Sequence, residues 1–162
     1  MRIGIGFDIH RLVSGRALLL GGVKIPSGKG LLGHSDGDAV LHAVCDALLG
    51  AVGAGDIGSY FPDTDPKWRG VSSRRFVAKA MQRVAQHRLR VSNADVVVLA
   101  EQPKLAPHRL AIQRTLAKML QVTPQQVSIK AKTMERLGPI GAGKAIAAYA
   151  VVLLERARRR LR

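Results

Sequence analysis

Residues 33–50 of this chain read Gly-His-Ser-Asp-Gly-Asp-Ala-Val-Leu-His-Ala-Val-Cys-Asp-Ala-Leu-Leu-Gly, and they decide the fold. Ser35 followed by Asp38, just ahead of an apolar run, is typical of a capping box, so the pattern predicts a helix that begins near Asp36. The apolar side chains of the run recur at helical spacing, which predicts that one face of this helix is buried in the core. These core positions are Leu41, Val44, Cys45, Leu48 and Val52.

A polar stripe lies along the same predicted helix. Asp38, His42 and Asp46 are each four residues apart, and side chains at that spacing lie above one another on one helix face. We therefore expect the His42 imidazole to lie between two carboxylates, an arrangement that fixes the tautomer of metal-bound histidines. The alternative is a half-buried histidine that pairs with an acid and binds no metal.

The residues just before this helix favour negative charge. His34 and Ser35 would present side chains and backbone N–H groups where the helix dipole is positive. We expect an anion to bind beside the start of the helix.

The composition indicates one folded domain. Of the 162 residues, 47% are hydrophobic and 23% are charged, which is typical of a globular protein rather than a disordered one. The single cysteine, Cys45, has no partner for an internal disulfide and favours a reducing, cytoplasmic location. We expect neither a signal peptide nor a membrane span, because the longest apolar run, 145–154, is too short to cross a bilayer.

The charge balance indicates an anionic partner. The chain holds 26 basic and 11 acidic residues, a net charge of +15, which can attract nucleic acid, a membrane surface or a small polyanion. Aromatic residues make up only 4% of the chain, which argues against stacking on single-stranded nucleic acid. We predict a small polyanionic ligand and no nucleic acid or membrane partner. A nucleic-acid-binding module that uses the arginine-rich tail, 156–162, is the alternative.

The pattern along the chain predicts a mixture of strands and helices. Residues 2–10 alternate in polarity, which predicts a strand with Asp8 and His10 on the same side, close enough to share a cation or to form an ordinary ion pair. Residues 145–154 fit either a helix or a strand, because alanine favours one and the Val-Val-Leu-Leu ending favours the other. Further expected elements are a hairpin over 17–26, helices over 72–87 and 107–120, and strands over 91–100 and 127–134. The chain is thus expected to be α/β, of the α+β type, with a β face packed by three helices.

Two loops resemble functional motifs to different degrees. The loop at 53–66 holds three carboxylates, which either cap turns or border a site. Residues 138–145 nearly match a phosphate-binding P-loop, but Ala145 stands where Ser or Thr must hold magnesium, so we reject that interpretation.

Three residues together suggest a metal centre. Asp8, His10 and His42 form a nitrogen–oxygen set, and three protein ligands with one open position is how catalytic zinc is held. A phosphate oxygen could take the open position. Glu135 could hold a second, harder cation if phosphates bridge to it.

These motifs resemble the 2-C-methyl-D-erythritol 2,4-cyclodiphosphate synthase family. The resemblance covers residues 2 to about 155, so we expect one domain at 1–155 and a basic C-terminal tail at 156–162. The matching segments are Gly6–His10, His34–Asp38, His42, Asp46, Gly55–Gly58, Phe61–Pro66, and Lys130–Ala131 with Thr133 and Glu135.

The resemblance implies a homotrimer with its sheets facing a three-fold axis and its active sites at subunit interfaces. It implies that 145–154 is a strand. The implied substrate is 4-diphosphocytidyl-2-C-methyl-D-erythritol 2-phosphate, whose 2-phosphate attacks the β-phosphorus, expels CMP and closes a cyclic diphosphate. This reaction belongs to the non-mevalonate route to isoprenoid precursors.

The resemblance also implies a role for each matched residue. Zinc would bind Asp8, His10 and His42, and a magnesium or manganese ion would bind Glu135. His34 and Thr133 would stabilise the transition state, and Asp38 and Asp46 would support the metal ligands from behind. The substrate would contact Ser35, Asp56, Ile57, Gly58, Phe61, Pro62, Asp63, Thr64, Asp65, Ala100, Glu101, Gln102, Pro103, Lys104, Leu105, Ala106, Ala131 and Lys132.

This chain departs from the family's sequence pattern at three positions, and a second reaction also fits the predicted metal ligands. Lys132 stands where the family often has a small hydroxyl residue, position 134 is Met, and Ala142 stands where some members carry arginine. A zinc phosphohydrolase with the same ligands, using water as nucleophile, is the second alternative.

Overall fold

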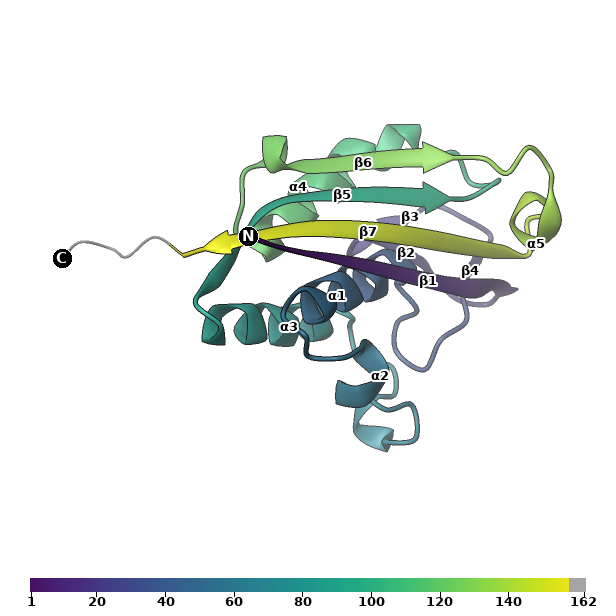
Figure 1. Ribbon diagram of the computed structural model, residues 1–162. Helices are drawn as coiled ribbons and strands as arrows, with labels where there is room; N and C mark the ends of the chain where they lie inside the picture. Colours follow the sequence, from purple (N-terminus) through teal and green to yellow (C-terminus); the bar gives the residue numbers. More distant parts are fainter. Residues whose placement is uncertain (158–162) are drawn as a thin grey trace.

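A five-stranded sheet with helices on one face forms the frame of the chain (Figure 1). The computed structural model describes residues 1–157, so the predicted tail lies outside the described residues from Arg158 onward. The strand order is β4-β1-β7-β5-β6, in which only the β5–β6 pair is parallel. The strands are β1 (Arg2–Ser14), β4 (Lys29–Leu31), β5 (Leu89–Leu99), β6 (Val127–Lys132) and β7 (Ala145–Arg156), and β2 (Leu18–Leu20) pairs with β3 (Val23–Ile25) in a separate hairpin.

Three long helices cover one face of the sheet. They are α1 (Ala39–Ala51), α3 (Arg74–Gln86) and α4 (Arg109–Leu120), and each contributes buried apolar side chains to one core. Shorter pieces are α2 (Ile57–Tyr60), α5 (Gly138–Gly141) and the 3₁₀ turns η1 (Pro66–Trp68), η2 (Ala106–His108) and η3 (Pro124–Gln126). The expected α/β domain with three helices on a β face is confirmed for the single chain.

Helix α1 begins three residues later than the capping-box pattern predicts. Asp38 is the N-cap, and its carboxylate accepts hydrogen bonds from the backbone N–H groups of Leu41 (3.0 Å), Gly21 (2.9 Å) and Gly22 (2.6 Å). Burial raises the pKa of Asp38, and these three N–H donors oppose the rise. Asp38 therefore starts the helix and also fastens the turn of the β2–β3 hairpin to it.

Helix α1 lies directly on strand β1 because two glycines leave room for it. A Cβ atom added at Gly4 would lie 1.9 Å from the carbonyl oxygen of Ala47, and one added at Gly6 would lie 2.0 Å from that of Ala43. Both distances are far shorter than any real contact, so only glycine fits at these positions. This close approach brings one face of α1 within reach of the β1 side chains that follow Gly6.

The apolar side chains of β1 lie on the opposite face of the sheet, which the helices leave uncovered. Ile3 and Ile5 are 70% and 68% exposed, and Phe7 and Ile9 are about half exposed. The Phe7 ring lies 4.6 Å, centroid to centroid, from that of Tyr149 on β7, which is also exposed. The alternation that predicts a strand is confirmed, while the core lies on the glycine side of that strand.

The remaining element predictions are largely confirmed. Residues 145–156 form a strand, as the resemblance implies, and the hairpin at 17–26 forms as expected. The short strand β4 is not among the elements expected from the sequence. Lys144 leads directly into β7 rather than into a long helix, consistent with the rejection of a P-loop. No described helix has the length and apolarity needed to cross a membrane.

The close approach of α1 predicts a specific sensitivity to substitution. Gly6→Ala should lower the free energy of unfolding by about 1–3 kcal/mol or more, because the new methyl group collides with the α1 backbone. The matched control is Gly28→Ala, where a Cβ meets nothing within 4 Å. Its effect should stay within about 0.5 kcal/mol. Equal losses for the two variants in chemical denaturation would contradict this packing.

Candidate metal centre and adjoining pocket

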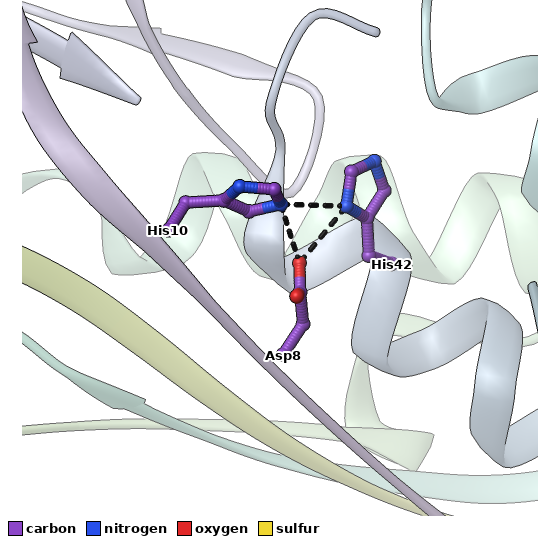
Figure 2. Close-up of side chains that lie close together, drawn as sticks. All are labelled: Asp8, His10 and His42. Atoms are coloured by element: carbon purple, nitrogen blue, oxygen red, sulfur yellow. Dashed lines mark hydrogen bonds and ion pairs between the residues drawn. The ribbon is translucent and has the colours of Figure 1, made fainter. Parts of the chain in front are cut away.

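Asp8, His10 and His42 bring three ligand atoms together, as predicted (Figure 2). Asp8 and His10 project from the same side of β1, and His42 projects toward them from α1. Asp8 Oδ2 lies 2.8 Å from His10 Nε2 and 2.9 Å from His42 Nδ1, and these two nitrogens are 3.0 Å apart. The two strand residues and the helix residue thus form a small triangle of one oxygen and two nitrogens.

This triangle fits a single divalent transition-metal ion. Zinc binds imidazole nitrogen and carboxylate oxygen at about 2.0–2.2 Å, so one ion can contact three atoms that lie no more than 3.0 Å apart. Imidazole and carboxylate together suit zinc and its first-row neighbours better than they suit calcium or magnesium. Three ligands leave a further position for a water molecule or a substrate oxygen.

In both imidazole rings, the nitrogen that lies outside the triangle makes a hydrogen-bond contact. His10 Nδ1 lies 2.6 Å from the carbonyl oxygen of Leu32, to which it donates, so in the neutral ring Nε2 carries the lone pair. His42 Nε2 lies 2.8 Å from the Ser73 hydroxyl and 3.0 Å from that of Ser35. Such contacts orient a ring toward a metal and are typical around bound ions.

The pKa values of Asp8 and His10 depend on the close contacts in this triangle. Burial disfavours the charge of Asp8, but hydrogen bonds and attraction from His10 and His42 outweigh it and hold the pKa of Asp8 below its usual range. Burial likewise disfavours protonation of His10, yet the hydrogen bond and charge of Asp8 dominate and raise the pKa of His10. In the absence of a metal, the carboxylate is therefore ionised and His10 retains its proton to higher pH than an isolated histidine.

A hollow of about 440 Å³ opens beside the triangle. Predicted substrate residues from two separate loops contribute to its wall, and His34 lies there with a buried Nε2 that has no hydrogen-bond partner among the described residues. An unpaired buried donor of this kind is costly unless a ligand satisfies it. The lining residues are Asp8, His10, His34, Ser35, His42, Ile57, Gly58, Phe61, Pro62, Asp63, Trp68 and Phe76.

Three carboxylates near this hollow hold the backbone that forms its wall. Asp46 Oδ1 accepts a hydrogen bond from Ile57 N at 2.7 Å, and burial raises the pKa of Asp46 despite that bond. Asp56 caps α2 through Ser59, and Asp65 caps the η1 turn through Lys67. Asp56, Thr64 and Asp65 do not line the hollow itself, so their predicted contact with substrate remains a prediction.

One expectation drawn from the α1 sequence is wrong. Asp38 and Asp46 do not flank the His42 ring. Asp38 has non-helical backbone angles and turns its carboxylate to the first-turn amides, and Asp46 turns toward Ile57. The ring contacts Asp8, Ser35 and Ser73 instead. The expected anion site beside the helix start stays a prediction, because Asp38 caps the helix while His34 and Ser35 line the hollow.

The second group of predicted residues lies elsewhere on the chain. Residues 100–106 follow β5 and residues 131–135 end β6, and the two segments are joined by the Ala100 N–Lys132 O hydrogen bond of 3.0 Å. Glu135 accepts a hydrogen bond from the Thr133 hydroxyl at 2.5 Å. None of these residues lines the 440 Å³ hollow in the described chain, because β7 and β5 lie between β1 and β6. The predicted site residues of one chain thus fall into two separate groups, one around the hollow and one at 100–106 and 131–135, here called the two half-sites.

Four residues near the hollow were not identified from the sequence. Phe76 lies within the helix expected over 72–87 and nothing in the sequence singles out Trp68, yet both pack on Phe61, at 4.3 and 4.9 Å between ring centroids. Ser73 resembles an ordinary helix cap, but its side chain makes no cap hydrogen bond. Arg16 donates to the carbonyl oxygens of Gly33 and Ser35 and holds the loop before α1. No pattern of spacing distinguishes these roles from common structural ones.

The raised pKa of His10 predicts how metal affinity depends on pH. Below that pKa, an incoming ion must displace a proton from His10, so affinity should fall by up to about tenfold per pH unit as pH is lowered from 8 to 6. Titration of the metal-free protein with Zn²⁺ at several pH values measures this. The exposed His87 is distant from the triangle, so His87→Ala should show the same profile. An affinity that is constant across this range would contradict the predicted role of His10.

Comparison with known proteins gives consistent results over nearly the whole chain. The model of the YgbB family matches residues 1–155. A 2-C-methyl-D-erythritol 2,4-cyclodiphosphate synthase from Synechococcus sp. (strain JA-2-3B'a(2-13)) is 57% identical over 154 residues, which cover 95% of this chain and 98% of that protein.

Solved structures agree with the fold. A 2C-methyl-D-erythritol-2,4-cyclodiphosphate synthase in its CDP-bound form has a TM-score of 0.88 at 46% identity, covering 95% of this chain and all of that one. The bifunctional IspDF from Campylobacter jejuni has a TM-score of 0.92 at 39% identity, and the match covers 96% of this chain but only 42% of that longer protein.

Proposed function

We propose, on the premise that this chain belongs to the YgbB family, that it converts 4-diphosphocytidyl-2-C-methyl-D-erythritol 2-phosphate to 2-C-methyl-D-erythritol 2,4-cyclodiphosphate and CMP. The relative that is 57% identical carries the name of this synthase. The chain would then act as a phosphorus–oxygen lyase in the non-mevalonate route to isoprenoid precursors. The observation that carries the proposal is the Asp8–His10–His42 triangle beside a hollow that holds the unpaired His34 nitrogen.

The reaction needs positioning and charge neutralisation more than a strong base. An oxygen of the 2-phosphate attacks the β-phosphorus of the diphosphate, the bond from that phosphorus to the CMP oxygen breaks, and CMP leaves as the eight-membered ring closes. A zinc ion on Asp8, His10 and His42 would supply Lewis-acid polarisation of a phosphate oxygen. No water is consumed, which distinguishes this reaction from hydrolysis.

The chain's own side chains supply the remaining functions. The unpaired Nε2 of His34 can donate a hydrogen bond to a phosphate oxygen, which stabilises charge that develops during transfer. Ile57, Gly58, Phe61 and Asp63 would enclose the methylerythritol unit, held in place by the Asp46 hydrogen bond to Ile57. Apolar walls exclude competing water from the reacting phosphates.

The nucleotide half of the substrate would bind the second half-site. Residues 100–106, with Lys104 on the phosphates, and the segment 131–133 would hold cytidine. Glu135 would hold the second cation, Mg²⁺ or Mn²⁺, and Thr133 beside it would contact the diphosphate. Since this half-site is separated from the metal triangle within one chain, a complete site requires the half-site of a neighbouring subunit.

We further propose a homotrimer whose sheets face a three-fold axis. The uncovered face of β1 and β7 carries a row of exposed apolar residues. A monomeric protein rarely exposes such a contiguous apolar patch to water. Burial of these side chains against two other copies would remove them from water and bring half-sites of different subunits together. The residues of this row are Ile3, Ile5, Phe7, Ile9 and Tyr149.

We also propose a cytoplasmic location and a small-molecule partner, on the basis of the cysteine content and charge of the chain. The single cysteine, Cys45, is buried and free, which supports the expected cytoplasmic location. A small polyanionic substrate accounts for part of the chain's basic character without a nucleic acid or membrane partner.

The activity can be tested directly with the diphosphocytidyl substrate. Wild-type protein supplied with Zn²⁺ and Mg²⁺ should release CMP and cyclic diphosphate in equal amounts, followed by ³¹P NMR. His42→Ala should lose bound zinc and nearly all turnover, because three ligands become two. His87→Ala is the matched control and should retain both. Linear phosphates in place of the cyclic product would instead indicate a phosphohydrolase.

The assembly can be tested with a charge placed on the uncovered sheet face. Ile5→Lys should convert a trimer of about three times 17.4 kDa to monomers, because a buried ammonium group cannot be satisfied at an apolar interface. Turnover should fall with it, since each site needs two subunits. Leu110→Lys, at an exposed position on α4, is the control. A wild-type protein that is monomeric by light scattering yet fully active would contradict the trimer.

A further inference from the structure

A buried serine and an aspartate lie behind His42, on the side away from the metal triangle. The Asp36 carboxylate accepts two hydrogen bonds from Ser73: one oxygen accepts from the backbone N–H at 3.0 Å, and the other accepts from the hydroxyl. The Ser73 hydroxyl oxygen in turn lies 2.8 Å from His42 Nε2. Ser73 is fully buried, so water does not compete for these contacts.

The direction of each hydrogen bond follows from the number of protons available. A serine hydroxyl has one proton, and the Ser73 proton points to the Asp36 carboxylate, which can only accept. The Ser73 oxygen must therefore accept from His42, so the His42 proton lies on Nε2. When an ion occupies the triangle, the lone pair on Nδ1, the atom that faces Asp8 and His10, is then available to bind it.

Ser35 cannot fix the ring in the same way. Its hydroxyl lies 3.0 Å from His42 Nε2 and 3.3 Å from the Ser73 oxygen, and it also accepts from Gly37 N at 3.3 Å. With no carboxylate to take its proton, this hydroxyl can either donate to or accept from its neighbours. Only Ser73 has its role determined by a charged acceptor.

The backbone around Ser73 is arranged for this contact rather than for helix capping. Ser73 stands at the N-cap of α3, where serine usually bonds to a first-turn N–H, yet it makes no such bond. Asp36 is held in place by its N–H, which donates to the Val71 carbonyl oxygen at 3.0 Å. The loop before α1 and the start of α3 are thus joined behind the metal ligand.

We propose that Asp36 and Ser73 are positioning residues for the metal centre. They form a carboxylate–hydroxyl–imidazole chain that fixes the His42 tautomer and orients the ring, and neither residue touches the ion. The inference rests on the metal centre of the proposed function. Supporting contacts of this kind change metal affinity by about 10–100-fold.

Metal affinity of the full chain tests the proposal without reference to turnover. Zn²⁺ dissociation constants are measured by competition with a chromophoric chelator at fixed pH. Ser73→Ala should weaken binding about 10–100-fold, because His42 Nε2 loses its fixed acceptor. Ser72→Ala, at the exposed neighbouring position, should bind Zn²⁺ as tightly as wild type.

A second variant tests whether the two residues act as one chain. Asp36→Asn leaves one acceptor oxygen for two Ser73 donors, so it should weaken binding about tenfold. Because Asp36 acts through Ser73, the double variant should bind Zn²⁺ no more weakly than Ser73→Ala alone, within about twofold. Fully additive losses of Zn²⁺ affinity in the double variant would overturn the proposed hydrogen-bonded link from Asp36 through Ser73 to His42.

A spectroscopic readout separates orientation of the ring from general loss of structure. In the Zn²⁺-loaded protein, ¹⁵N shifts of His42 should show Nδ1 bound to the metal and a hydrogen-bonded proton on Nε2, and Ser73→Ala should shift the Nε2 resonance while its melting temperature changes by only a few degrees. Wild-type affinity and an unchanged Nε2 resonance in Ser73→Ala would overturn the inference and leave the proposed function intact. A wild-type chain that binds no zinc would overturn the metal centre itself, and this inference with it.

Discussion

The contact between the backbone of α1 and strand β1 is the constraint on which the site depends. Gly4 and Gly6 leave no side chain between strand and helix, and the carbonyl oxygens of Ala47 and Ala43 occupy that space. His42 directly precedes Ala43 on the helix, and Asp8 follows Gly6 by two residues on the strand. The same packing that buries the α1 core stripe therefore also brings the imidazole to the carboxylate. Stability and metal geometry are set by one interface.

Charged groups behind that interface are used to hold the backbone rather than to bind ligands. Asp38 starts α1 and fastens the β2–β3 turn, Asp46 fixes Ile57, and Asp36 holds Ser73. Each carboxylate accepts from backbone N–H groups, which lowers the cost of placing it in or near the core. Among residues 1–157, Asp8, His10 and His42 form a group of three side chains whose ligand atoms could hold one ion.

Much of the fold follows from local patterns in the sequence. Helical spacing predicts α1, α3 and α4, and alternation predicts β1, because those periods are set by local geometry. The pattern does not reveal which face of β1 is buried, since Ile3 and Ile5 resemble core residues while the true core face is glycine. Spacing also cannot choose between Ser35 and Asp38 as the cap, because both residue types cap helices well.

The metal triangle is predictable because two of its members share a strand face and the third begins a helix. The role of Ser73 is not predictable from the sequence. A serine at the start of a helix gives the same sequence pattern whether it caps that helix or supports a histidine elsewhere. The separation of the two half-sites is likewise a property of sheet order, which only the folded chain reveals.

The central claim is that Asp8, His10 and His42 bind one divalent ion. X-ray absorption spectroscopy of the zinc-loaded protein tests it most directly, because it reports the ligands around the metal itself. We predict one zinc per chain with two imidazole nitrogens and one carboxylate oxygen among its ligands at about 2.0–2.2 Å. Substoichiometric zinc, or a zinc environment with fewer than two imidazoles, would contradict it.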